Sequence, residues 1–107
     1  MNETAKLLKA LSNDNRLTIM VFLNQKELCV CQIEKLLNLS QANVSRHLTV
    51  LKHAGLVATR REGLWIYYSV VKPKNKIENK VFELFCELKN SKSSLQINLL
   101  KLKSCKN

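Results

Sequence analysis

Two cysteines separated by a single residue, Cys29 and Cys31, are the side chains of this chain best suited to chemistry. Thiolates are soft ligands that select soft ions, and the positive end of a helix favours the thiolate form of a cysteine. Residues two apart on a regular helix point about 200° apart, so both thiols can hold one ion only if one precedes the first turn or that turn opens. The pair predicts a soft-ion site that constrains the start of a helix. The alternative is two ordinary buried cysteines.

The segments around this pair are predicted to be mainly helical. Apolar spacing indicates helices over residues 3–11, around 17–23, and over 31–37, 41–53 and 75–89, with β-strands over 56–61 and 65–70. Asn13 or Asp14 can cap the second helix, Ser40 caps the fourth, and Gly55 ends it. Gly63 lies in a hairpin turn between the strands. This order predicts a mainly α winged helix-turn-helix with a small β-hairpin.

The length of 107 residues suits one compact domain, and the net charge of +10 favours a polyanionic partner. We expect residues 1–90 to form a DNA-binding and dimerisation domain, and residues 91–107 to form a basic tail, helical or mobile. A solvated lysine-rich surface is the alternative explanation of the charge. No apolar run approaches the ~18 residues of a membrane span, and residues 1–9 lack a signal-peptide core. These features predict a cytoplasmic protein without a membrane partner.

Two short helices joined by a three-residue turn are typical of a DNA-binding helix-turn-helix. We expect Val44, Leu48 and Leu51 to face the core. The opposite face carries side chains that can pair with bases or contact phosphates, and the hairpin adds two arginines. The predicted DNA-binding residues are Ser40, Gln41, Asn43, Ser45, Arg46, Lys52, Arg60 and Arg61. A merely solvated helix face is the alternative, and the turn, the cap, the hairpin and the charge together weigh against it.

Residues 5–71 resemble the ArsR/SmtB family of metal-responsive repressors. Residues 27–31, which read ELCVC, match the motif of its arsenic and cadmium/lead branches. The match to its helix-turn-helix and wing runs through residues 40–41, 45–48, 51–52, 55–57, 60–63 and 67–68. The resemblance implies a homodimer that stays on a palindromic operator until its inducer arrives.

The chain departs from this family in ways that bear on the inducer. The best-known arsenic sensors carry a third cysteine three residues after the second, where this chain has Glu34. Cadmium/lead members add cysteines from an N-terminal extension, and no cysteine precedes Cys29 here. Zinc members use Asp and His on the C-terminal helix, and residues 75–89 contain neither. Zinc is therefore disfavoured, and trivalent arsenic or antimony is favoured.

A third sulfur donor is expected, because trivalent arsenic prefers three sulfurs. Cys105, in the basic tail, is slightly favoured over Cys86 in the predicted helix over residues 75–89, or over no third protein ligand. A free surface thiol is the alternative role of Cys105, and a buried interface residue is that of Cys86.

We therefore expect a homodimeric transcriptional repressor, without enzymatic activity or a required cofactor, that leaves its operator when arsenite or antimonite binds Cys29 and Cys31. Because one recognition helix reads only a half-site, the two reading heads should lie about 34 Å apart. Two rivals keep this fold: a sensor of cadmium, lead or thiol oxidation, and a DNA-binding regulator with inert thiols. A thiol-redox enzyme would need a Cys-x-x-Cys motif near a βαβ unit, and the sequence has neither.

Overall fold

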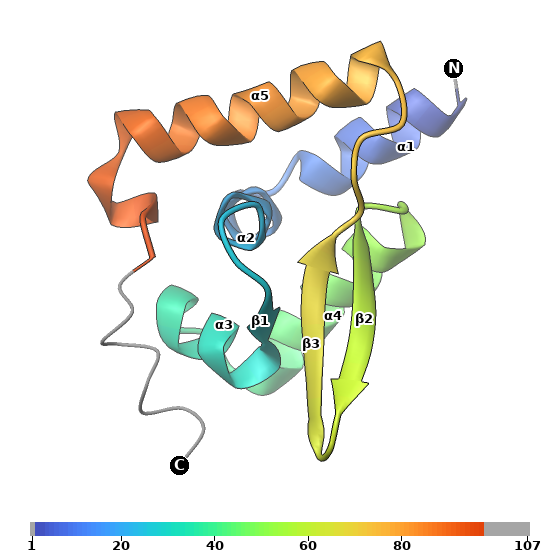
Figure 1. Cartoon of the computed structure of the whole chain (residues 1–107). Helices are drawn as coiled ribbons and strands as arrows, with labels where there is room; N and C mark the ends of the chain where they lie inside the picture. Colours follow the sequence, from blue (N-terminus) through green and yellow to red (C-terminus); the bar gives the residue numbers. More distant parts are fainter. Residues whose placement is uncertain (1, 98–107) are drawn as a thin grey trace.

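The computed structural model of the chain describes residues 2–97, which fold around a central helix (Figure 1). The helices are α1 (Asn2–Leu11), α2 (Asp14–Leu23), α3 (Val30–Leu37), α4 (Gln41–His53), α5 (Lys76–Ser91) and the 3-10 turn η1 (Ser93–Leu95), and the strands are β1 (Leu28–Cys29), β2 (Val57–Glu62) and β3 (Trp65–Val70). α1 and α5 lie at one end of the molecule, and α3 and α4 lie at the other. The predicted winged helix-turn-helix is confirmed, with one strand more than expected.

The central helix is α2, which Figure 1 shows end-on. Its last five residues, 19–23, are all buried, because other elements surround it on every side. α5 crosses one side of α2 and buries Phe85 completely, while Phe82 packs edge-on against that ring at a centroid distance of 5.1 Å. This shared core holds the helix-turn-helix and the sheet on one rigid support.

Polar and glycine signals set the helix ends as predicted. Asn13 caps α2, and its side chain accepts a hydrogen bond from the backbone N–H three residues on at 3.1 Å. Ser40 caps α4 and accepts from the N–H of Asn43 at 3.2 Å. Asn38 adopts a left-handed conformation, φ 55°, that turns the chain between α3 and α4, and Gly55 does the same after α4 at φ 78°.

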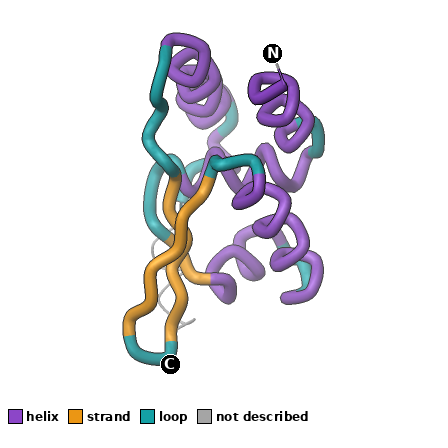
Figure 2. Tube along the Cα trace, turned by 90° about the vertical axis from the view of Figure 1, so that its right-hand side faces the viewer, coloured by secondary structure: helices purple, strands orange, loops and turns teal. Residues whose placement is uncertain are grey.

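The strands form one antiparallel sheet in the order β1-β3-β2. β2 and β3 are the predicted hairpin, and this hairpin, the wing, projects from the body of the molecule (Figure 2). β1 was missed by the sequence prediction, because two residues are too short to show an alternating pattern. Since β1 consists of Leu28 and Cys29, the first of the two thiols lies in the sheet.

The C-terminal part of the described chain returns to the core. α5 follows a cap at Asn75 and extends two residues past its predicted end. At the end of η1, the side-chain amide of Gln25 donates to the carbonyl of Leu95 at 2.6 Å. The remainder of the predicted basic tail, residues 98–107, lies outside the described residues. Among the residues that are described, no helix has the length and apolar character needed to cross a membrane.

Candidate functional site

Cys29 and Cys31 lie on either side of the start of α3. Cys29 is the last residue of β1 and the N-cap of α3, whereas Cys31 is the second residue of the helix. One thiol therefore precedes the first turn, as helix geometry requires of a shared ligand. Cys29 is 1% exposed and its backbone N–H donates to the side-chain oxygen of Gln32 at 3.0 Å, while Cys31 is half-buried. A ligand that engages both sulfurs has to reach the joint between the sheet and α3.

A cavity of about 240 Å³ opens beside the two cysteines. Residues 29–31 and Glu34 form one wall, Gln41 at the start of α4 contributes to a second, and residues 64–66 of the wing form a third. The cavity is therefore shared by three parts of the molecule: the thiol segment, the start of the predicted reading helix, and the wing.

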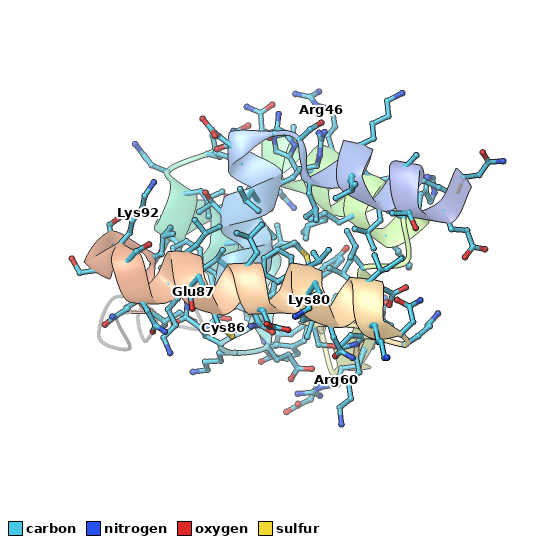
Figure 3. The ribbon with its side chains drawn as sticks, turned by 90° about the horizontal axis from the view of Figure 1, so that it is seen from above. Arg46, Arg60, Lys80, Cys86, Glu87 and Lys92 are labelled. Carbon is cyan, nitrogen blue, oxygen red and sulfur yellow. The ribbon has the colours of Figure 1, made fainter. Side chains whose placement is uncertain are left out.

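The other predicted sulfur donors do not join this pair within the described residues. Cys31 is disulfide-bonded, while the other described cysteines are free thiols. Cys86 is exposed on α5 (Figure 3), where Asn24 donates to its sulfur at 3.6 Å, and it does not line the cavity. Cys105 lies outside the described residues. Residues 2–97 contain no cluster of three or more His, Cys, Asp or Glu side chains able to hold a metal ion.

α4 presents most of the predicted reading residues to solvent. The predicted core stripe is confirmed, because its members Val44, Leu48 and Leu51 are all buried. The predicted DNA-binding residues of the cap and helix lie on the remaining surface: Ser40, Gln41, Ser45, Arg46 and Lys52 are exposed, and Asn43 is half-buried. Arg46 donates a side-chain hydrogen bond to Asn43, one turn nearer the helix start. The guanidinium is thereby held toward the N-terminal end of α4.

His47 is half-buried beside this face. Burial lowers the pKa of its imidazole, and the positive charges of Arg16 and Arg46 lower it further. The ring is therefore neutral at neutral pH. It adds no charge next to Arg46, which is the cation that α4 offers at this point of the surface.

The two arginines of the wing have different surroundings. The Arg60 guanidinium lies 4.7 Å from the centroid of the Tyr67 ring and forms ion pairs with Glu27 at 2.7 Å and Glu62 at 2.8 Å. Hydrogen bonds to these carboxylates raise the pKa of Arg60, and the hydrogen bond to Glu27 has the larger effect. Arg61 is exposed, has no carboxylate partner among the described residues, and faces the other side of the hairpin as the next residue of a strand. In the sequence the two arginines form one basic pair, and only the strand pairing separates their surroundings.

Glu27, Trp65 and Tyr67 belong to the neighbourhood of the thiols, although their sequence positions predict no individual role for them. Glu27 is the first residue of the 27–31 motif, and this position was the only feature of the sequence that linked it to the thiols. In the sequence Trp65 is recognisable only as a strand residue, and Tyr67 as a strand residue within the match to the family's wing. Pairing of β3 with both β1 and β2 is what brings these side chains next to the thiol segment.

The sequence matches known DNA-binding regulators. Residues 13–59, which include both cysteines, α3 and α4, match the family model described as bacterial regulatory protein, arsR family. The chain is 42% identical over 69 residues to a cadmium resistance transcriptional regulatory protein CadC homolog of Staphylococcus aureus, over 64% of this chain and 57% of that protein. It is 41% identical over 64 residues to the arsenical resistance operon repressor of Escherichia coli, over 59% of this chain and 55% of that protein. The chain spans about half the length of such relatives.

Solved structures share the fold over a larger part of the chain. HlyU from Vibrio cholerae superposes with a TM-score of 0.70 at 34% sequence identity, over 81% of this chain and 91% of that chain. The homodimeric winged helix-turn-helix DNA-binding domain of a possible ArsR-family transcriptional regulator from Mycobacterium bovis superposes with a TM-score of 0.68 at 32% identity, over 84% of this chain and 78% of that chain.

Proposed function

Because this chain belongs to the ArsR family of bacterial transcriptional regulators, which bind DNA and are not enzymes, we propose that it is a repressor released from its operator by trivalent arsenic or antimony. Cys29 and Cys31 bind the inducer, and a homodimer binds a palindromic operator in the cytoplasm. The observation that carries the proposal is the cavity in which these two thiols meet Gln41 of the reading helix and residues 64–66 at the tip of the wing.

The position of the thiols supports a signal that acts on DNA binding. The Cys29 sulfur is buried, so a ligand that engages both sulfurs has to move the joint between β1 and α3. α3 packs directly against α4, and the start of α4 lines the same cavity. A change at the joint therefore reaches the reading helix and the wing. Couplings of this kind are typically ~1–3 kcal/mol, or about 5–150-fold in affinity.

The chemistry of the donors supports a soft inducer. Thiolates select soft ions, and the relatives include regulators named for arsenical and for cadmium resistance. Reducing compartments keep protein thiols reduced, so the inducer is tested on the reduced protein. We place the third sulfur of the arsenic site on Cys105 and keep Cys86 as the alternative, because Cys86 lies away from the cavity.

DNA is read by α4 and supported by the wing. Gln and Asn side chains can pair with adenine, and an arginine can bind guanine or phosphate in a forked geometry. The proposed contacts come from the α4 cap, the exposed face of α4 and the wing: Ser40, Gln41, Asn43, Ser45, Arg46, Lys52, Arg60 and Arg61. Arg61 is the more direct wing contact, because the guanidinium of Arg60 is already bound by two carboxylates.

Dimerisation is supported by apolar surface at one end of the molecule. Leu8 of α1 and Ile77 and Leu84 of α5 are 52%, 55% and 47% exposed. α1 and α5 lie at the same end of the molecule (Figures 1 and 2), and exposed apolar residues that gather on neighbouring helices mark interaction surfaces. A symmetric dimer presents two copies of α4, which suits a palindromic operator.

The proposal is tested by operator binding of the reduced protein in graded arsenite. Cys29→Ser and Cys31→Ser are each expected to keep operator affinity and to lose release by arsenite, because neither thiol lies among the base-reading side chains. Cys86→Ser is the matched control and is expected to be released normally. Thermal unfolding of each variant verifies that the fold is intact. Normal release of either Cys29→Ser or Cys31→Ser would refute the assignment of that ligand.

Thiol oxidation is a second candidate signal, favoured by the disulfide bond of Cys31. Parallel titrations with arsenite, cadmium and peroxide separate the candidates. Release by peroxide and not by arsenite would assign the site to oxidant sensing, and release by cadmium at lower concentration than arsenite would assign it to soft divalent metals. No release by any of the three would leave a DNA-binding regulator with inert thiols.

A further inference from the structure

One row of directly paired residues across the three strands joins the thiol site to the wing. Cys29 of β1 is paired with Tyr67 of β3, and Tyr67 is paired on its other side with Arg60 of β2. Residues directly opposite one another in an antiparallel sheet carry their side chains on the same face. The first thiol and an arginine of the wing are therefore neighbours of the same tyrosine.

The side chain of Arg60 extends from this row of paired residues to Glu27, in the segment that carries the thiols. Its guanidinium lies over the Tyr67 ring, and two of its nitrogens donate to the two oxygens of Glu27 at 2.8 and 2.7 Å. Glu27 precedes Cys29 by two residues. Such a two-point pair between a guanidinium and a carboxylate fixes direction as well as distance. The contacts close a loop from Cys29 through Tyr67 and Arg60 to Glu27.

The same orientation turns Arg60 away from the reading helix. Figure 3 shows Arg46 and Arg60 on opposite sides of the molecule, pointing away from one another. Arg61 faces the other side of the hairpin, because successive residues of a strand alternate. The guanidinium of Arg60 is thus engaged by Glu27 and Glu62 in this state, while Arg46 and Arg61 are the more direct DNA contacts.

We infer that the Arg60–Glu27 pair, set on Tyr67, couples the thiol site to the wing and holds the wing in its DNA-binding orientation until the inducer arrives. The inference rests on the proposed function. Because the Cys29 sulfur is buried, ligation moves residue 29, and the peptide chain carries Glu27 with it. The wing then loses two contacts together: the strand pairing of Tyr67 with Cys29, and the ion pair of Arg60 with Glu27. Arg60 and Glu27 are positioning residues, since neither has to touch the inducer.

The strength of an ion pair is not the quantity that matters here. Arg60 and Glu27 are 50% and 31% exposed at their side chains, and exposed pairs contribute little to the stability of a fold. Coupling depends instead on a contact that exists in one state and not in the other. The test must therefore compare the operator affinity with and without inducer.

The test compares Glu27→Gln with a matched control, Glu62→Gln, in the reduced full chain. Both variants remove one negative charge next to Arg60, and only the first removes the link to the thiol segment. Operator affinity is measured by fluorescence anisotropy of labelled DNA, with and without arsenite. Arsenite binding itself is followed by the emission of Trp65, the single tryptophan of the chain, which lines the cavity.

Glu27→Gln is expected to bind arsenite, as Trp65 reports, and to show at least about a five-fold smaller ratio of operator affinities without and with arsenite. Its operator affinity without arsenite should fall, because the wing is already released. Glu62→Gln should keep the wild-type ratio. Arg60→Gln should reproduce the ratio of Glu27→Gln, and the double variant should fall no further, because the two residues act as a unit.

Three outcomes would overturn the inference. If Glu27→Gln keeps the wild-type ratio of operator affinities without and with arsenite, the Arg60–Glu27 pair does not couple the thiol site to the wing. Tighter operator binding by Glu27→Gln with an unchanged ratio would mean that Arg60 is a phosphate contact that Glu27 restrains. An equal fall in ratio for Glu62→Gln would mean that charge and not the link is responsible. Failure of the wild-type chain to respond to arsenite is a different result, since it refutes the proposed function itself.

Discussion

Arg46 lies on the second turn of α4, exposed and held toward the helix start by Asn43. Arg46→Ala is expected to weaken operator binding by about 1–3 kcal/mol, because a well-placed arginine supplies a forked contact to guanine or phosphate. Competition with operator and unrelated duplexes measures the loss. Lys80→Ala is the control: it removes the same charge from α5, on another side of the molecule (Figure 3). An equal loss in both variants would show that net charge alone explains the effect.

The third sulfur is a further prediction at the residue scale. Cys105→Ser is expected to weaken the arsenite response and Cys86→Ser to leave it unchanged, because Cys86 does not line the cavity of Cys29 and Cys31. The loss should be partial, since two thiolates still bind the ion. X-ray absorption of the arsenite-bound protein counts the sulfurs directly. Three sulfurs in Cys105→Ser would exclude that residue and favour Cys86 or an added small thiol.

Among the elements, α4 depends on its buried stripe for its position. Leu48 is 1% exposed, and Leu48→Ala is expected to lower the free energy of unfolding by roughly 2–5 kcal/mol through lost burial and the cavity that remains. Val50→Ala, on the exposed side of the same helix, should change it by about 0.5 kcal/mol or less. Denaturant titrations at equal protein concentration compare them. Similar losses in both variants would contradict the assignment of the buried face.

The wing is the second element with its own prediction. Arg61→Ala is expected to weaken binding to all duplexes alike and to reduce the dependence of log affinity on log salt concentration by about one unit, because one phosphate contact is lost. Operator titrations over a range of salt concentrations give this slope. An unchanged slope, or a loss confined to the operator sequence, would mean that Arg61 does not contact phosphate.

For the whole molecule, the apolar end formed by α1 and α5 predicts the dimer. Leu84→Asp places a charge on this surface and is expected to give a monomer in sedimentation, with operator affinity reduced because one α4 reads only a half-site. Leu64→Asp is the control for oligomeric state, since it places the same charge on the exposed tip of the wing. A Leu84→Asp chain that stays dimeric would locate the interface elsewhere.

Local physical chemistry made much of this fold predictable from sequence. Ser40 caps α4 because its hydroxyl satisfies a free backbone N–H, and Gly55 and Gly63 adopt positive φ angles that other residues rarely take. The buried stripe of α4 followed from side chains at helical spacing. The placement of the thiols at the entry to α3 was predictable too, because the apolar residues at helical spacing, Ile33, Leu36 and Leu37, begin directly after the pair.

Contacts between distant segments were decided only by the tertiary structure. β1 exists because Leu28 and Cys29 pair with β3, and two residues show no pattern of their own. The sequence placed Arg60 and Arg61 together, but a strand turns neighbours to opposite faces, and the partner of Arg60 is 33 positions away at Glu27. Local spacing determines which face of a helix is apolar. Which charges meet across a sheet depends on how the strands pair, and no local pattern records that pairing.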